Sequence, residues 1–95
     1  MSAYFVAVRD SITDPKELQV YGEKAGQSVG SHKIMPLAVY GRVRSTEGLP
    51  VEGAVILKFD TFAEAEAWYD SPGYQDAMKH RMKGGKYRTF IVEGM

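Results

Sequence analysis

The stretch that decides the fold of this chain is Phe59–Tyr74, which reads FDTFAEAEAWYDSPGY. Thr61, followed three residues later by Glu64, forms a capping box and predicts an alanine-rich helix that runs through Trp68. Ser71-Pro72 predicts a second helix start, because a serine hydroxyl caps a helix and proline fits the first turn. The stretch therefore predicts one helix that is broken in two.

The predicted elements on either side of this stretch are strands and one further helix. Ala3–Val8 and Ala54–Phe59 are continuous apolar runs, which predict strands buried on both faces. Asp14–Glu17 carries an N-cap, a first-turn proline and a glutamate, which together predict a helix start. Leu37–Arg44 alternates and predicts a strand, with Tyr40 and the two arginines on one face. Tyr87–Glu93 is the last predicted strand.

Two helical faces follow from residue spacing. The helix that starts at Pro15 has an apolar face made of Leu18, Tyr21, Ala25 and Val29. Gly22, Gly26 and Gly30 lie four apart on the same predicted helix, and each glycine costs about 1 kcal/mol relative to alanine. Close packing on the sheet and early fraying of the helix both explain them. In the last helix, Tyr74, Met78 and Met82 lie four apart, and Gly84-Gly85 ends it.

The order β-α-β-β-α-β predicts a ferredoxin-like α+β domain. Its four-stranded antiparallel sheet has both helices on one face, whereas the central strands are apolar on both. An uncovered apolar face of that size favours a partner. We therefore predict a homodimer in which the open sheet faces of two copies pack about 10 Å apart.

The composition limits the function classes. Ninety-five residues predict a single domain, residues 1–95. Twelve basic residues balance twelve acidic ones, so no net charge attracts nucleic acid or an anionic membrane. The absence of cysteine excludes disulfides and thiolate metal sites and fits a reducing compartment. The short run Ala3–Val8 does not resemble a signal peptide, and no run approaches the roughly 20 apolar residues that cross a bilayer. We expect a cytoplasmic protein with no membrane partner.

The segment Ala65–Gln75, followed by a basic helix and by Ile91–Gly94, resembles the bacterial domain-of-unknown-function family thirteen-thirty, in the dimeric α+β barrel superfamily. Ala3–Val6 and Thr13–Pro15 match the same family, so the resemblance covers nearly the whole chain. It implies a ferredoxin-like fold and a homodimer formed across the sheets. It implies no reaction, because the wider superfamily ranges from cofactor-independent monooxygenases and lactone isomerases to haem enzymes and stress-response proteins. Between Ile34 and Glu47 the chain departs from the family pattern, where a glycine-rich hairpin is usual.

Aromatic residues that the predicted fold places between sheet and helices are candidates for the wall of a small-molecule cleft. Such clefts have aromatic walls and a few polar tips. The alternative is that Trp68 and Tyr74 are core residues that anchor the two short helices. The candidate ligand-binding residues are Tyr21, Tyr40, Arg42, Trp68, Tyr74 and His80.

Arg42 would bind a ligand carboxylate in a bidentate manner if its strand face points toward the helices. If that face points outward, Arg42 is a solvated charge or an interface residue. A local carboxylate is the expected partner, and the choices are Asp60, Asp70 and Glu93.

The histidines and the basic segment give weaker signals. His32 and His80 are the only histidines and have no other ligand at useful spacing, so we expect no metal and assign no cofactor. His80 could serve as a general base or a haem ligand, but a solvated histidine at a helix end is the simpler interpretation. Lys79–Arg88 is basic, yet RNA-recognition domains of this topology carry stacking aromatics on a central strand. Ala54–Phe59 is aliphatic instead, so we expect no nucleic-acid partner.

Two hypotheses of function remain. In the first, each protomer binds or transforms a small apolar or aromatic, oxygen-bearing metabolite between sheet and helices, with Tyr or Arg donating hydrogen bonds. In the second, the protein is a non-catalytic homodimeric module whose aromatics are core. A cavity of roughly 300 Å³ or more favours the first hypothesis.

Overall fold

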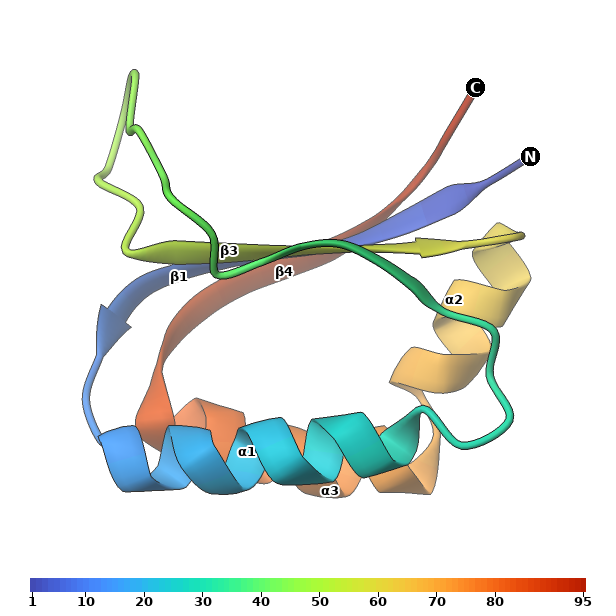
Figure 1. Ribbon diagram of the computed structural model, residues 1–95, viewed down its shortest axis with the longest axis horizontal. Coiled ribbons are helices and arrows are strands. Elements are labelled where there is room, and N and C mark those ends of the chain that lie inside the picture. Colours follow the sequence, from blue (N-terminus) through green and yellow to red (C-terminus); the bar gives the residue numbers. More distant parts are fainter.

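The computed structural model describes all residues, Met1–Met95, as one sheet layer and one helix layer (Figure 1). The strands are β1 (Ala3–Ile12), β2 (Met35–Val39), β3 (Gly53–Phe59) and β4 (Gly85–Glu93). The helices are α1 (Pro15–Ser28), α2 (Phe62–Tyr69) and α3 (Pro72–Gly84). The sheet order is β2-β3-β1-β4, and all neighbouring strands are antiparallel. The predicted ferredoxin-like α+β fold is thereby confirmed.

The helix starts form as the capping residues predict. The side chains of Asp14, Thr61 and Ser71 accept hydrogen bonds from backbone N–H groups in the first turns of α1, α2 and α3, respectively. Pro15 and Pro72 occupy the first turns of α1 and α3, where a missing N–H costs nothing. The second helix is therefore divided at Asp70-Ser71, which lets α2 and α3 take different directions (Figure 1).

The core lies between the sheet and the helices and is mostly aromatic. Phe5, Phe59, Trp68 and Tyr74 are each at most 2% exposed. The ring centroids of Trp68 and Tyr74 are 4.2 Å apart, and that of Phe5 lies 5.2 Å from Trp68 in an edge-to-face contact. Such aromatic pairs are worth about 0.5–1.5 kcal/mol beyond the area they bury. Trp68 and Tyr74 therefore fix α2 and α3 on β1.

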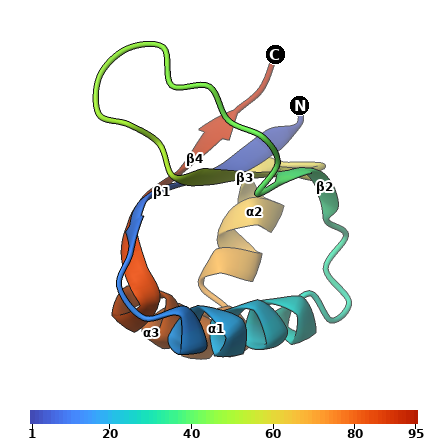
Figure 2. The same ribbon diagram turned by 60° about the vertical axis from the view of Figure 1, so that its left-hand side comes forward.

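The other face of the sheet is uncovered. The register aligns Ile56, Val6 and Phe90 across three strands on that face. Phe90 is 52% exposed and Val92 is 45% exposed. The central strands are thus apolar on both faces, as predicted, and the helices cover only one of them (Figure 2).

The second strand is shorter than predicted. β2 ends at Val39, and Tyr40 takes a left-handed backbone conformation with φ 52°. A left-handed backbone is not compatible with an extended strand, so the strand does not continue beyond Tyr40. The alternation predicted for Leu37–Arg44 therefore does not place Arg42 and Arg44 on a face of the sheet. The segment that follows rises from the sheet on the side away from the helices before it returns to β3 (Figure 1).

The glycines of the first helix are neither close-packed nor a fraying signal. α1 runs through Gly22 and Gly26 to Ser28, and Gly30 lies beyond its end with φ 48°. A Cβ atom built on Gly22 or Gly26 would meet nothing within 4 Å. No residue of α1 is fully buried. The helix therefore stands off from the sheet at this point.

None of the three helices is long and apolar enough to span a bilayer.

Candidate functional site

A cavity of about 350 Å³ occupies the space between α1 and the β2-β3-β1 side of the sheet. Hydrophobic side chains make up ten of its thirteen lining residues. Gly22 and Gly26 form part of the wall on the helix side, and Val55 and Leu57 form part of the sheet side. Figure 2 shows the backbone of these elements, with α1 facing the sheet and the segment that joins α1 to β2 running between the two layers.

The structure places three of the predicted site residues in the cavity wall. They are Tyr21 from α1, Tyr40 after β2 and Trp68 from α2. Tyr74 does not line the cavity, but its hydroxyl oxygen lies 2.9 Å from the hydroxyl oxygen of Tyr21. Trp68 donates a hydrogen bond from its indole Nε1 to Ser28 Oγ over 3.1 Å. The indole nitrogen is thereby satisfied, and the ring remains as an apolar wall.

Tyr40 lines the cavity next to Arg9 of β1. Its ring packs against Gly53, where a Cβ would lie 2.9 Å from Tyr40 Cδ1. The Arg9 guanidinium carbon lies 4.2 Å from the ring centroid, and the Tyr40 and Tyr87 hydroxyls are 2.8 Å apart. Arg9 in turn is paired with Glu52. Tyr40 is thus held on the helix side of the sheet although the chain after it rises on the other side.

The tyrosine hydroxyls of the site are hydrogen-bond donors at neutral pH. Burial raises the pKa of Tyr21 well above its usual value, and the nearby Tyr74 hydroxyl adds to the shift. Burial also raises the pKa of Tyr40, and its hydrogen bond with Tyr87 raises it further. Burial raises the pKa of Tyr74 too, although the Tyr21 hydrogen bond and the positive charge of Arg81 oppose the shift. None of these phenols is suited to act as a base.

Arg42 and His80 lie away from the cavity. Arg42 is exposed in the segment between β2 and β3 and forms no ion pair, so the expected partners Asp60, Asp70 and Glu93 do not contact it. The reason is the early end of β2, which removes Arg42 from the sheet. His80 is half-buried, and its Nδ1 lies 2.6 Å from Glu17 Oε2, so it bridges α3 to α1 instead of standing free in solvent.

Helical spacing did not predict the burial of Arg81 in the last helix. Met82, predicted on the apolar face of α3, is 66% exposed, whereas Arg81 is only 5% exposed. The residues of α3 that are buried are Tyr74, Ala77, Arg81 and Gly84. Their spacing of three and four is helical, but an arginine on it carries no signal of burial in a segment rich in basic residues.

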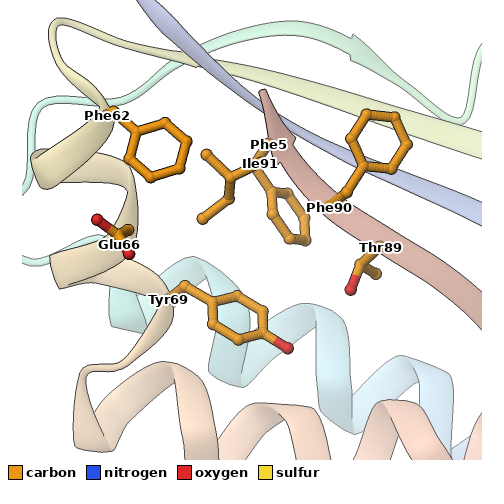
Figure 3. Close-up of a pocket in the computed structure, with 7 residues that line it drawn as sticks. All are labelled: Phe5, Phe62, Glu66, Tyr69, Thr89, Phe90 and Ile91. Atoms are coloured by element: carbon orange, nitrogen blue, oxygen red, sulfur yellow. The ribbon is translucent and has the colours of Figure 1, made fainter. Parts of the chain in front are cut away.

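A second hollow of about 310 Å³ lies at the outer edge of β4, beside α2 (Figure 3). Phe62 and Tyr69 extend from α2 toward it, and Phe90 and Ile91 extend from β4. It is a shallower depression, and its polar side chains are Glu66, Thr89 and the Tyr69 hydroxyl. That hydroxyl donates a hydrogen bond to Met78 Sδ, so it is not free to bind a ligand.

No group of three or more His, Asp or Glu side chains is placed to hold a metal ion.

The family model described as "Domain of unknown function (DUF1330)" matches residues 2–95. The chain belongs to this family. The family resemblance of the Trp68-Tyr69-Asp70-Ser71-Pro72 run is thereby confirmed, and the run has a structural explanation in the divided second helix. Among curated protein sequences, none matches the chain.

Solved structures of low sequence identity share the fold of this family member. A protein of unknown function from Rhodopseudomonas palustris has a TM-score of 0.74 at 14% identity, over 99% of this chain and 82% of that one. A dimeric ferredoxin-like protein of unknown function from Jannaschia sp. CCS1 has a TM-score of 0.72 at 9% identity, over 99% and 100%. SnoaB, a cofactor-independent oxygenase from Streptomyces nogalater, has a TM-score of 0.65 at 9% identity, over 99% and 93%.

Proposed function

We propose that this protein is a homodimeric binding protein for a small apolar or aromatic, oxygen-bearing molecule, held between the sheet and α1. The observation that carries the proposal is the cavity of about 350 Å³, whose wall is mostly hydrophobic. Its size lies in the range of small-molecule sites, about 300–1,000 Å³. A helix that carries two glycines at its wall, each with open space where a side chain would stand, supports a site kept open for a ligand.

Binding accounts for the polar groups better than catalysis does. The Tyr21 phenol has a raised pKa, so it keeps its proton and donates to an oxygen instead of removing a proton. His80, the one candidate base among the predicted residues, is paired with Glu17 outside the cavity wall. The likeness to SnoaB concerns the fold alone, and we therefore propose binding without a chemical step.

The homodimer proposal rests on the uncovered sheet face. Val6, Ile56 and Phe90 form an apolar row across it, and Tyr4 and Val92 flank that row. The segment between β2 and β3 rises on the same side and exposes Leu49 at 68% (Figure 1). A second copy would cover this surface with an identical one, which is the usual arrangement of a two-fold dimer. The dimeric state of the Jannaschia protein supports the same assembly.

The test of ligand binding uses Trp68, which lines the cavity and is the only tryptophan of the chain. We expect 4-propylbenzyl alcohol or 4-propylbenzoate to change its fluorescence with saturation, and calorimetry to return the same Kd. The variant Gly26→Leu adds a side chain at a residue that lines the cavity without weakening the helix, since leucine is a strong helix former. We expect it to bind at least about tenfold more weakly, which is about 1.4 kcal/mol.

The matched control is Gln19→Leu, which adds the same side chain to an exposed position of α1 outside the cavity wall. It should bind as the unsubstituted protein does. Failure of both probes to bind would remove the proposed function and favour the non-catalytic module. Equal weakening by both substitutions would show that the probes bind elsewhere.

A further inference from the structure

The wall of the cavity between α1 and the sheet carries no charged side chain. Ten of the thirteen lining residues are hydrophobic, and the other three are two glycines and a proline. The only polar side-chain atoms among the lining residues are the hydroxyls of Tyr21 and Tyr40 and the indole nitrogen of Trp68. A ligand in this cavity therefore meets neither a cation nor an anion on the residues that line it.

Each of these three polar atoms already has a hydrogen-bond partner inside the protein. The indole nitrogen of Trp68 donates to Ser28 Oγ. The hydroxyls of Tyr21 and Tyr40 each share a hydrogen bond with a second tyrosine hydroxyl, over 2.9 Å and 2.8 Å respectively. Buried polar groups need at least one such partner, and here the protein provides it. The wall therefore does not require a charged ligand to satisfy its polar atoms.

Two arginines beside the tyrosines of this region do not supply a charge for a ligand. The Arg9 guanidinium carbon lies 4.2 Å from the Tyr40 ring centroid, and the guanidinium is paired with Glu52. Arg81 is buried, but it is not a lining residue, and it packs over the ring of Tyr87. A carboxylate in the cavity would thus lose its hydration without contacting a cation, which is a large cost.

A tyrosine hydroxyl that shares one hydrogen bond keeps the capacity for another. If Tyr21 donates to Tyr74, its lone pairs can accept from a ligand, and if it accepts, its own proton is free to donate. The same holds for Tyr40 and Tyr87. An alcohol or a phenol fits both arrangements, because its hydroxyl donates and accepts. A carboxylate only accepts, so it fits one of them.

We infer that the ligand of this cavity is an uncharged alcohol or phenol, and that the site discriminates against the corresponding carboxylate. This inference rests on the proposed function and names its ligand class. The hydrophobic wall disfavours the anion because it offers no counter-charge. The single hydroxyl of the ligand pairs with a tyrosine hydroxyl of the wall.

The test compares 4-propylbenzyl alcohol with 4-propylbenzoate, by calorimetry and Trp68 fluorescence at pH 7, where the benzoate is an anion. We expect the alcohol to bind at least about tenfold more tightly to the unsubstituted protein. The neutral 4-propylbenzamide has the shape of the benzoate and separates the effect of charge from that of shape. It should bind within about threefold of the alcohol.

The variant Val39→Lys supplies the cation that the wall lacks. Val39 lines the cavity and is 57% exposed, so a lysine there can keep its ammonium at the rim without being buried. We expect the ratio of the two affinities to shift toward the benzoate by at least about fivefold. The matched control is Leu37→Lys, which adds the same charge to an exposed residue of β2 outside the cavity wall. It should leave the ratio unchanged.

Benzoate that binds the unsubstituted protein as tightly as the alcohol, or more tightly, would overturn the inference and leave the cavity as a binding site. Benzamide that binds as weakly as the benzoate would also overturn it, because shape would then explain the preference. The same holds for an equal shift in both lysine variants, or for no shift in Val39→Lys. If none of the three probes binds, the proposed function itself fails.

Discussion

The substitution Gly22→Ala is expected to stabilise the protein, although Gly22 is one of the residues that line the cavity. Gly22 lies in the middle of α1, and its built Cβ meets no atom within 4 Å. No contact must therefore be rearranged, and the full helix preference of alanine over glycine is gained. That preference is about 0.8–1.0 kcal/mol in a helix interior. For a domain of this size, 1 kcal/mol corresponds to a rise in Tm of about 4–8 °C.

Gly84→Ala is the matched comparison, because the same atom is added to another helix and the structure predicts the opposite sign. The built Cβ at Gly84 lies 2.6 Å from Leu18 Cδ2 and 3.0 Å from the Leu18 backbone nitrogen. The Gly84 carbonyl also accepts hydrogen bonds from the backbone N–H groups of Thr13 and Asp14, which holds the two helix ends together. Relief of the clash requires a shift of α1, and overpacking of this kind costs about 1–3 kcal/mol.

The measurement is urea denaturation followed by circular dichroism, with the free energy of unfolding compared at unchanged m-value. Concentration must be the same for all variants, because a dimer gains apparent stability from mass action. A neutral or destabilising Gly22→Ala would show that α1 packs closely on the sheet and that the cavity is filled. A stabilising Gly84→Ala would refute the close approach of α1 and α3.

Three further predictions concern the core, the open face and the tyrosines. Trp68→Ala should lower the free energy of unfolding by about 3–5 kcal/mol in urea denaturation; a loss below about 1 kcal/mol would contradict its role in the core. Phe90→Asp should give a monomeric mass by light scattering where the unsubstituted protein is a dimer, while Met82→Asp, a charge on exposed α3, should not. Since burial raises the pKa of Tyr21, stability should be complete below the unfolded tyrosine pKa of about 10 and fall above it, by up to about 1.4 kcal/mol per pH unit. Tyr21→Phe should flatten that fall in urea denaturation between pH 9 and 11, and an equal slope would contradict the burial of its hydroxyl.

The elements of this fold could be predicted where the signal is local. The caps at Asp14, Thr61 and Ser71 form bonds within one helical turn, so residues adjacent in sequence decide them. The runs in β1 and β3 that are apolar on both faces could also be predicted, because successive side chains of a strand point to opposite faces of the sheet. These features were sufficient for the ferredoxin-like topology and for the divided second helix.

The end of β2 could not be predicted, because it depends on residues far apart in sequence. Tyr40 leaves the strand geometry in order to place its ring on Gly53, beneath Arg9 and against Tyr87. Alternation through Arg44 predicts a longer strand, and nothing nearby in the sequence opposes it. Because β2 ends at Val39, Arg42 lies outside the candidate site, whereas Tyr40 lines it.

The burial of Arg81 depends on the tertiary structure in the same way. The sequence by itself determined the α+β class, the helix starts and the two apolar faces of the sheet, because spacing and capping act over a few residues. Only the tertiary structure decided that α1 stands off from the sheet at Gly22 and Gly26, and that Arg81 is buried against the Tyr87 ring. Cavities and uncompensated charges are properties of the space between elements, and residues from α1, α2, α3 and the sheet must come together before that space exists.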